Sequence, residues 1–459
     1  MTGVRSRTHA HNKPSGVGWA GDVPRHWEVG NLRRFARMKT GHTPSRQEAT
    51  YWEGCTIPWF TLADVWQLRE EKQKYLGETK EMISEVGLAN SAAELLPAGT
   101  VVLSRTASVG FSGIMPVPMA TSQDYWNWIC GDRLLPDYLL YLLRAMRQEI
   151  ERSTMGSTHK TIYQSDAAAF TICVPPVGEQ RAIVGFLDHQ TARIDLLVEK
   201  KRELVERLKE KRAALISRTV TQGLPPDTAR AAGLDPYPRL KPSEVRPLGR
   251  VPEHWKVRRL KSVVTRVEQG WSPECEARAA DDGEWGVLKV GCVNGEDFDT
   301  REQKALPSSL VPPRELEVCP GDILMSRANT TELLGSVVLV RATRPRLLLC
   351  DKLYRLHVTG AESDFVVRLL TSGVSRYQIE GGATGASPSM KNIAQDTLRN
   401  IVFAFPPRDE QRAIADFLDR ETAKIDRLVA KVEEAIERLI EYRSALITAA
   451  VTGKIDVRN

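Results

Sequence analysis

One helical segment occurs twice in this chain, and that repeat limits the folds the chain can adopt. The segment EQRAIVGFLDHQTARID, residues 179–195, returns as EQRAIADFLDRETAKID, residues 410–426, with twelve of the 17 positions identical. The two copies stand about half a chain length apart in a protein of 459 residues. A repeat with so long a period indicates a duplicated domain rather than a solenoid of short repeats.

Shorter repeats show that the duplication extends over most of the chain. They follow the same order in both halves: a tryptophan-containing opening, a strand ending in Ser-Arg, a Lys-x-Ile segment, a Pro-Pro pair and the long helix. Each half therefore reads as one globular domain followed by one helix. The matching strings are VPRHWEV (23–29) with VPEHWKV (251–257), GTVVLSR (99–105) with GDILMSR (321–327), and KTIYQ (160–164) with KNIAQ (391–395).

Each repeated helix begins a long run of apolar residues at steps of three, four and seven. This period predicts two helices of roughly 40 residues with a heptad component. Proline pairs at 175–176 and 406–407 set their starts, and Gly223 and Gly453 their ends. The residues expected in the seam are Ile183, Leu187, Ile194, Leu197, Leu204, Leu208 and Leu215 in the first helix, and Ile425, Leu428, Val432, Ile436, Leu439 and Leu446 in the second.

If the two helices bury their seams on each other, the connectivity makes the pair antiparallel. At 1.5 Å per residue such a pair is about 60 Å long, with one domain at each end and pseudo-two-fold symmetry. Two similar domains held at a fixed distance suit a linear target with two separated half-sites.

The domain segments are rich in β-branched residues, Gly and Pro, with short alternating runs between turn signals. They predict mixed α/β (α+β) domains, each with a strongly curved sheet. The expected division is a basic, disordered tail at 1–15, a first domain at 16–175, a first spacer helix at 176–222, a Pro-rich linker at 223–250, a second domain at 251–405 and a second spacer helix at 406–459.

Composition narrows the class of protein only modestly. The net charge of +6 and pI near 8.9 favour polyanionic partners weakly, because the excess is spread over a long chain. Seven scattered cysteines without a C-x-x-C pair argue against a disulfide framework or a thiolate zinc site. No apolar run approaches a membrane span, and the basic opening has no apolar segment behind it. We expect a cytoplasmic protein.

The ordered, duplicated set of motifs resembles the specificity (S) subunit of type I restriction–modification systems, from Ser15 to Val457. The openings SGVGWAGDVPRHWEV and LGRVPEHWKVRRL, the following elements IPWFTLADV and WGVLKVGCVN, and the two PP…EQRAI helices are similar to that family's target recognition domains and shared helical regions. The second opening lacks the Ser-Gly-x-x-Trp of Ser15–Trp19, so its packing is expected to differ.

The resemblance implies a function that composition alone does not indicate. Each recognition domain would read one half of a bipartite, asymmetric DNA target, and the helices would set the spacer and dock two methyltransferase subunits. Restriction–motor subunits would complete the complex. The partner subunits would use S-adenosylmethionine, ATP and Mg, whereas this chain would need no cofactor and would not itself be catalytic.

Candidate DNA contacts lie in or near the strings that recur in both halves, which we call the paired landmarks. Base and phosphate contacts use Arg, Lys and polar side chains on strand ends and loops. Arg105 and Arg327 each follow a strand, and a structural tie between strands is an equally good interpretation. Trp27, Trp255, Trp59 and Trp285 are expected to be core residues instead. The full set of predicted DNA contacts is Lys39, Thr43, Arg105, Lys160, Trp271, Lys289, Arg327 and Lys391.

Candidate partner contacts lie at the helix starts, where three polar residues are identical in both copies. The alternative is that the glutamates compensate the helix dipole. The predicted residues are Glu179, Gln180, Arg181, Glu410, Gln411 and Arg412.

Enzymatic alternatives find little support in the sequence. The nearest string to a methyltransferase Asn/Asp-Pro-Pro-Tyr/Phe signature is DPYP at Asp235, which lies in the linker and out of order. Asp297, Asp299, Glu302 and Lys304 could form a nuclease metal site, but such spacing is common by chance and the first half has no equivalent. No G-x-x-x-x-G-K-[ST] phosphate loop occurs.

Overall fold

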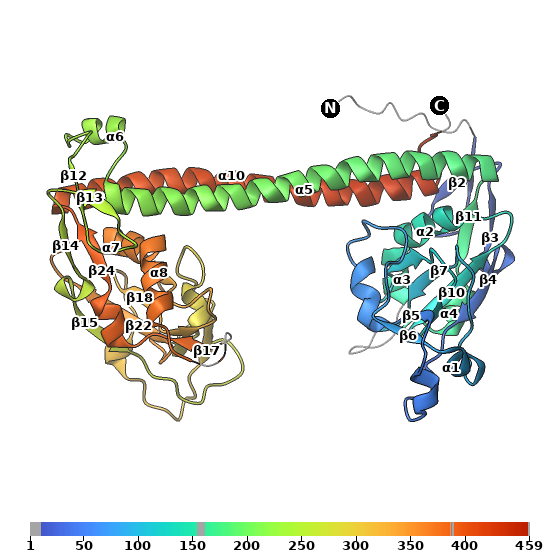
Figure 1. Ribbon diagram of the computed structural model, residues 1–459, viewed down its shortest axis with the longest axis horizontal. Coiled ribbons are helices and arrows are strands. Elements are labelled where there is room, and N and C mark those ends of the chain that lie inside the picture. The colour runs from blue at the N-terminus through green and yellow to red at the C-terminus, as the bar shows by residue number, and fades with distance from the viewer. Residues whose placement is uncertain (1–10, 154–160, 386, 388–389, 458–459) are drawn as a thin grey trace. The chain divides into compact units, whose positions relative to one another are not determined.

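The chain divides into two compact units, each built from one domain and parts of both long helices. In this computed structural model, residues 11–153, 161–385, 387 and 390–457 are described. The first unit takes in the described residues up to 203 and from 432 onward, and the second takes in residues 204–431. The two long helices are α5 (Val177–Gln222) and α10 (Arg408–Val451) (Figure 1). Mixed α/β domains and long helices, as predicted, are confirmed.

The domain of the first unit is made of small sheets rather than one strongly curved sheet, which corrects the expectation. Its four-stranded sheet has the order β4-β10-β7-β8, and a three-stranded sheet has the order β6-β5-β9. The strands are β1 (Asn12–Pro14), β2 (Asp22–Pro24), β3 (Glu28–Asn31), β4 (Ala36–Thr40), β5 (Ile57–Phe60), β6 (Glu81–Ile83), β7 (Val101–Ser104), β8 (Ser112–Ile114), β9 (Ala120–Thr121), β10 (Tyr125–Cys130) and β11 (Thr171–Val174).

Short helices cover this domain, and β3 pairs with β11 directly before α5. They are α1 (Glu85–Ala89), α2 (Pro136–Ala145), α3 (Arg147–Ser153) and α4 (Gln164–Ala168).

The second unit repeats the plan of these two sheets and adds a further two-stranded sheet. Its four-stranded sheet has the order β15-β22-β18-β20 and its three-stranded sheet the order β17-β16-β21. The strands are β12 (Leu240–Pro242), β13 (Arg250–Pro252), β14 (Lys256–Arg259), β15 (Val264–Gln269), β16 (Gly286–Leu288), β17 (Gln303–Ala305), β18 (Ile323–Ser326), β19 (Ala328–Asn329), β20 (Val337–Leu339), β21 (Leu347–Leu348), β22 (Leu353–Val358), β23 (Lys391–Asn392) and β24 (Val402–Phe405), and the helices are α6 (Pro226–Ala231), α7 (Ser363–Leu370), α8 (Gly373–Gly382) and α9 (Gln395–Asn400).

Strand register confirms that the two sheets are equivalent. In the first unit Ser104 lies opposite Tyr125 and Lys39 opposite Asn127. In the second, Ser326 lies opposite Leu353 and Glu268 opposite Arg355. Lys39 and Glu268 therefore occupy equivalent positions in the two units, although their side chains carry opposite charges.

One expectation about the irregular segments is wrong. Residues 12–14, expected in a disordered tail, form β1 and pair with β2, while residues 1–10 lie outside the described part of the chain. In the expected linker, β12 pairs with β13 in the same way, and α6 precedes it. A short strand can form in each segment because the neighbouring opening strand offers free backbone groups.

The second opening also packs as the first does, which corrects the expectation that it differs. Ser15 N donates to Gly21 O and Ser243 N to Gly249 O, at 3.1 and 2.9 Å. Glu244 takes the left-handed backbone conformation of Gly16, with φ of 62° against 70°. Ser243 is therefore the counterpart of Ser15, and the turn tolerates a non-glycine residue at a modest conformational cost.

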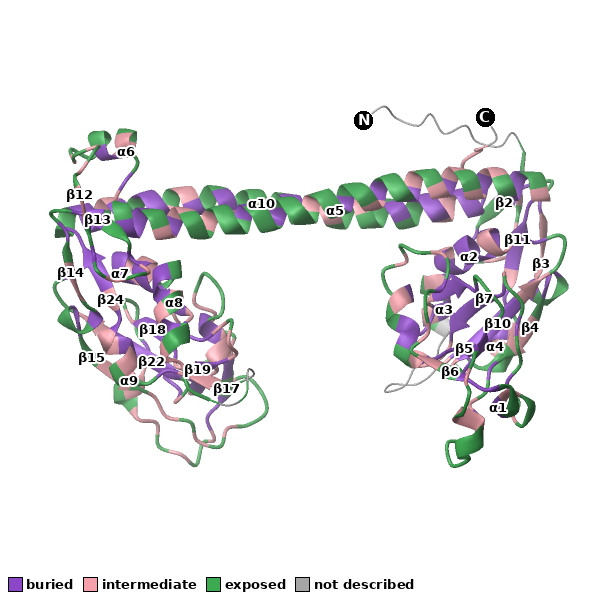
Figure 2. Cartoon of the chain, viewed as in Figure 1, coloured by how far each residue is buried: buried purple, intermediate pink, exposed green. Residues whose placement is uncertain are grey.

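Within each unit, a part of α5 packs antiparallel on a part of α10, with the buried residues of both helices in the contact (Figure 2). In the first unit Ile183, Leu187 and Ile194 share one core with Leu446 and Ile447. Trp27 and Trp255 are buried, as predicted, at 1% and 0% exposure. Among the described residues, the search for a helix long and apolar enough to cross a membrane finds none.

Candidate functional site

The predicted landmarks of the first unit lie in loops that backbone hydrogen bonds hold together. Arg105 N donates to Asp124 O at 2.9 Å, and Ile162 N donates to Arg105 O at 2.9 Å. His42 N donates to Thr121 O at 3.0 Å. We call segments 41–43, 105–106, 121–124 and 161–162 the loop cluster of the first unit.

The second unit builds the same loop cluster from segments 270–272, 327–328, 349–352 and 392–393. Arg327 N donates to Lys352 O and Ile393 N donates to Arg327 O, both at 2.9 Å. Trp271 N donates to Leu349 O at 3.0 Å. The backbone frame is therefore common to both units, so any difference in what they contact must come from the side chains.

Arg105 and Arg327, the two landmark arginines, each lie on an aromatic ring near the start of an inner sheet strand, β10 in the first unit and β22 in the second. The guanidinium carbon of Arg105 is 4.5 Å from the ring centre of Trp126, and that of Arg327 is 5.8 Å from Tyr354. Burial raises the pKa of the Tyr354 hydroxyl, and the charge of Arg327 opposes this increase. Both arginines are half-buried, and the Nε of each is buried without a hydrogen-bond partner among the described residues. Arg327 Nη1 also donates to Asp351 O at 3.1 Å, so this side chain ties two segments, and the prediction that both arginines contact DNA stays a prediction.

The remaining predicted contacts are spread around these clusters. Lys39, on the edge strand β4, forms an ion pair with Glu94 at 2.7 Å. Lys289 stands 3.7 Å from Glu302. Lys391 Nζ donates to Gly385 O at 2.6 Å, on the strand that pairs with the residues after Arg327. Trp271 lies in the loop cluster of the second unit and also packs against a core. Lys160 lies outside the described residues.

Four of the predicted partner contacts are buried within their own units, which favours the structural interpretation of these residues. Glu410 accepts from Trp255 Nε1 at 3.0 Å and lies 2.8 Å from His254 Nε2. Gln411 accepts from Glu362 N at 2.9 Å and donates to Pro406 O at 2.9 Å. These contacts attach the domain opening to the helix start.

The first unit repeats this attachment. Glu179 accepts from Trp27 Nε1 at 3.1 Å and lies 2.8 Å from His26 Nε2. Gln180 accepts from Leu135 N and donates to Arg133 O, both at 2.8 Å. The identity of these residues in both copies therefore has a structural cause. Only Arg181 and Arg412 of the predicted set are exposed.

A second duplicated contact joins each domain to its helix further along. Lys74 bridges Asp137 and Asp188 in the first unit, at 2.5 and 2.8 Å. Arg341 bridges Asp364 and Asp419 in the second, at 2.6 and 3.3 Å. Burial lowers the pKa of Lys74, but hydrogen bonds to the two aspartates outweigh it, so the net pKa is raised. Lys74 precedes β7 in the first unit, whereas Arg341 follows β20 in the second. Because the two cations do not stand at equivalent positions, the repeat pattern alone could not reveal this contact.

Sequence reasoning also missed two side chains inside the loop clusters, those of Gln123 and Asp351. Thr43 Oγ1 donates to Gln123 Oε1 at 2.5 Å, and Ser272 Oγ donates to Asp351 Oδ1 at 2.5 Å. Gln123 lies two residues before β10 and Asp351 two residues before β22, in segments TSQD (121–124) and LCDK (349–352) that differ at every equivalent position. Because these segments differ completely, only the position before a shared strand could have drawn attention to them.

Of the residues considered for a nuclease metal site, Asp299 and Glu302 lie beside cations of the chain itself, Arg301 and Lys289. Asp299 binds Arg301 at 2.9 Å, and that arginine lowers the pKa of Asp299 to about 2. No group of three or more His, Cys, Asp or Glu side chains suited to a metal ion is found in the described part of the chain.

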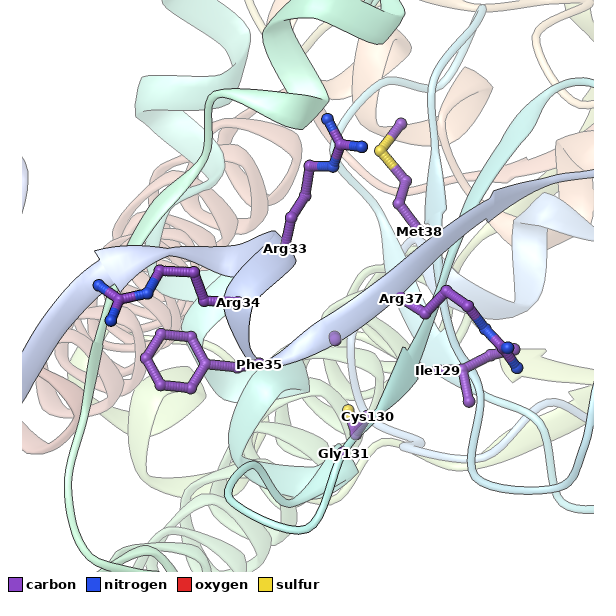
Figure 3. Close-up of a pocket in the computed structure, with 9 residues that line it drawn as sticks. Arg33, Arg34, Phe35, Arg37, Met38, Ile129, Cys130 and Gly131 are labelled. Atoms are coloured by element: carbon purple, nitrogen blue, oxygen red, sulfur yellow. The ribbon is translucent and has the colours of Figure 1, made fainter.

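A pocket of about 530 Å³ borders the start of β4 in the first unit. Figure 3 shows that Arg33, Arg34 and Arg37, which line it, point in different directions rather than toward a common centre. A bound anion needs converging donors, so this pocket lacks the arrangement of an anion site.

Comparison with known proteins connects this geometry to a family. Residues 24–207 match the family model described as "Type I restriction modification DNA specificity domain". The specificity subunit of the type I restriction enzyme EcoEI of Escherichia coli is 29% identical over 204 residues, which cover 44% of this chain and 34% of that subunit. The match to the MjaIX specificity subunit of Methanocaldococcus jannaschii likewise spans only 43% of that relative.

Two further likenesses cover nearly the whole chain. The EcoKI specificity subunit of Escherichia coli K12 is 20% identical over 450 residues, covering 95% of this chain and 90% of that one. A chain from a solved structure titled for complex assembly and conformational transition of the type I R-M system has a TM-score of 0.62 at 17% identity, covering 94% and 98%, and shows that the fold is shared. The duplicated domains and the long helices agree with these comparisons: the chain is similar to type I restriction–modification specificity subunits over nearly its whole length, and residues 24–207 match that family's DNA specificity domain.

Proposed function

We propose that this chain recognises a bipartite, asymmetric DNA sequence, with one half-site for each unit, and is not itself catalytic. The observation that carries the proposal is that one loop cluster is built twice on the same backbone frame and carries different side chains. A shared frame with unlike side chains suits the reading of two unlike half-sites. Base edges are read by hydrogen bonds from such side chains, while phosphate contacts position the protein.

The clusters offer suitable groups for both kinds of contact. Arg105 and Arg327 are partly exposed cations beside outward loops, and Lys391 follows on the neighbouring strand. We assign Thr43 and Trp271, which lie in the loop clusters, to the same contact surfaces, and Lys39 and Lys289 to their periphery; Lys160 stays a predicted DNA contact from its sequence. Neutralising phosphates releases counterions, so we expect the binding to weaken steeply with salt.

We further propose that the long helices dock two methyltransferase subunits and, through the assembled complex, restriction subunits, in the cytoplasm. Exposed apolar side chains on the helices support this, because such residues are costly to leave in water. They are Leu196, Leu197, Ile440 and Tyr442 in the first unit, and Leu204 and Leu428 in the second. Arg181 and Arg412 would contribute charged contacts. S-adenosylmethionine, ATP and Mg would be bound by the partners.

The test of DNA recognition is a selection from a randomised duplex library with the purified full-length chain. We expect the retained duplexes to share two short sequences separated by a constant number of unspecified base pairs. Retention of one uninterrupted sequence, or of duplexes without a shared sequence at low salt, would contradict the proposal.

Partner docking is tested by co-expressing the chain with a methyltransferase subunit encoded beside it. Adenine methylation should appear at the same two-part sequence and should require this chain. Co-purification of the two proteins without methylation at that sequence would instead favour a role as a scaffold.

A further inference from the structure

Gln123 and Asp351 occupy the same place in the two loop clusters but carry different chemistry. Gln123 follows Ser122, whose carbonyl lies close to Gly41, and Asp351 follows Cys350, whose carbonyl lies close to Gly270. Gln123 accepts a hydrogen bond from the Thr43 hydroxyl and Asp351 one from the Ser272 hydroxyl, both at 2.5 Å. Each also lies directly before a residue whose carbonyl accepts from the landmark arginine N–H. The correspondence is therefore fixed by backbone contacts and not by sequence similarity.

The surroundings hold both side chains at the outer side of the cluster. Gln123 is exposed and Asp351 is partly exposed. Arg327 Nη1 donates to the backbone carbonyl of Asp351 at 3.1 Å, and Ser272 Oγ accepts from Asp351 N at 3.2 Å. A side chain anchored in this way loses less conformational entropy when it makes a further hydrogen bond.

Their hydrogen-bonding groups differ in a way that would discriminate between bases. Because Thr43 donates to the amide oxygen of Gln123, the amide N–H groups remain to donate. Ser272 occupies Oδ1 of Asp351, so Oδ2 remains to accept. A carboxylate is repelled by phosphates, and in DNA it finds donors mainly on base edges, such as the amino group of cytosine. A glutamine amide suits adenine.

We propose that Gln123 and Asp351 are the equivalent specificity-determining residues of the two units, with Gln123 reading an adenine and Asp351 the amino group of a cytosine. This inference rests on the proposed function, since it names the residues that read the two half-sites.

The experiment compares the wild-type chain, Asp351→Asn and Asp282→Asn in parallel selections from one randomised duplex library. Asp282 is an exposed loop residue outside the loop cluster, so its variant makes the same change of charge elsewhere in the unit. We expect Asp351→Asn to change the preference at a single base pair of one half-site about tenfold, with the other half-site unchanged. Asp282→Asn should retain the wild-type motif.

Gln123→Glu gives the reciprocal result in the other half-site, and it carries the test if thermal melting shows that Asp351→Asn is unfolded. If both folded variants select the wild-type motif, the two residues only brace their turns, and the inference is wrong. If the wild-type chain itself selects no two-part sequence, the proposed function fails, which is a distinguishable result.

Discussion

Asp195 and Arg443 face each other between α5 and α10 of the first unit, with 3.0 Å between Oδ1 and Nε. The second unit contains the reciprocal pair, in which Arg212 Nε donates to Asp426 Oδ1 at 2.8 Å. Asp195 and Asp426 are the last residues of the two repeated helical segments. Thus each helix supplies the aspartate in one unit and the arginine in the other, and the repeat preserves a contact between the helices.

Arg443→Ala should lower the stability of the first unit by about 1–3 kcal/mol, because it leaves a half-buried carboxylate without its partner. The variant also removes the hydrogen bond from Arg443 Nη2 to Glu71 O, at 2.7 Å. Urea unfolding of the full chain measures the loss. Arg438→Ala is the matched control, since this exposed arginine pairs with Glu434 four residues earlier on the same helix, and it should cost less than about 0.5 kcal/mol. Equal costs for the two variants would contradict the role assigned to Asp195 and Arg443.

Glu410→Ala should destabilise the second unit by about 1–3 kcal/mol, because the buried indole N–H of Trp255 loses its acceptor. The fluorescence maximum of the chain should shift on unfolding at a lower urea concentration than in the wild type. Glu199→Ala, an exposed glutamate in the middle of α5, provides the control and should change stability little. An unaltered midpoint for Glu410→Ala would mean that other groups fix the domain opening to the helix.

The long helices and the duplication could be predicted because both leave strong, regular patterns in the sequence. The seam was predicted less well. Leu197, Leu204 and Leu428 were expected in it but are more than 40% exposed, whereas Val198 and Val205 are buried. Each of the first two leucines stands one residue before a valine, and one residue rotates a side chain by about 100° around the helix. Apolar periodicity cannot choose between adjacent apolar positions, so the partner helix decides.

The candidate site was predicted only in outline. Repeated residues such as Arg105 and Arg327 could be found because both copies keep them, and the same criterion led to Glu179 and Gln180, whose shared role is structural. Residues that differ between the units, such as Gln123 and Asp351, leave no repeat signal, although their equivalence is clear from the backbone hydrogen bonds around them. A comparison of two copies reveals the common scaffold better than the parts in which the copies differ.

The stability of the second unit should fall below about pH 4.5 in part through Glu268. Burial raises the pKa of this carboxyl, but hydrogen bonds from His357 and Arg355 and the charges of Arg355 and Arg266 outweigh it, so the pKa in the folded state is lowered. The ionised form is therefore favoured by folding, and its contribution is complete above the unfolded pKa of about 4.3 and is lost as the pH falls through the folded value. In melting experiments from about pH 6 to about pH 3, the difference between the wild type and Glu268→Gln should shrink as the pH falls. A difference that stays constant would exclude this carboxyl as a source of the pH dependence.

Alanine at Gly41 or Gly270 should disrupt the loop clusters. A β-carbon at Gly41 would overlap the carbonyl oxygens of Thr121 and Ser122, and one at Gly270 would overlap those of Leu349 and Cys350. Because the clash is with backbone, the loops must move, and we expect losses of about 2 kcal/mol or more together with weaker DNA binding. Gly185→Ala in α5 meets no atom within 4 Å and should stabilise the helix by about 0.5–1 kcal/mol. Unchanged melting of Gly41→Ala would show that the cluster tolerates a wider spacing.

Arg327→Ala should weaken DNA binding chiefly through one half-site. The side chain is partly exposed, and its Nη1 binds Asp351 O, so the variant removes a cation at the outward loops and loosens a residue assigned to base reading. We expect binding to fall about tenfold and its salt dependence to decrease by about one phosphate contact. The measurement is the affinity for duplexes in which either half-site is scrambled, made at several salt concentrations. If the variant has a lower melting temperature and its affinity for both half-sites falls equally, Arg327 acts only as a structural tie. If the variant is folded and its affinity falls for one half-site alone, the contact is supported. Arg105→Ala should then affect the opposite half-site, because it holds the equivalent place in the first unit.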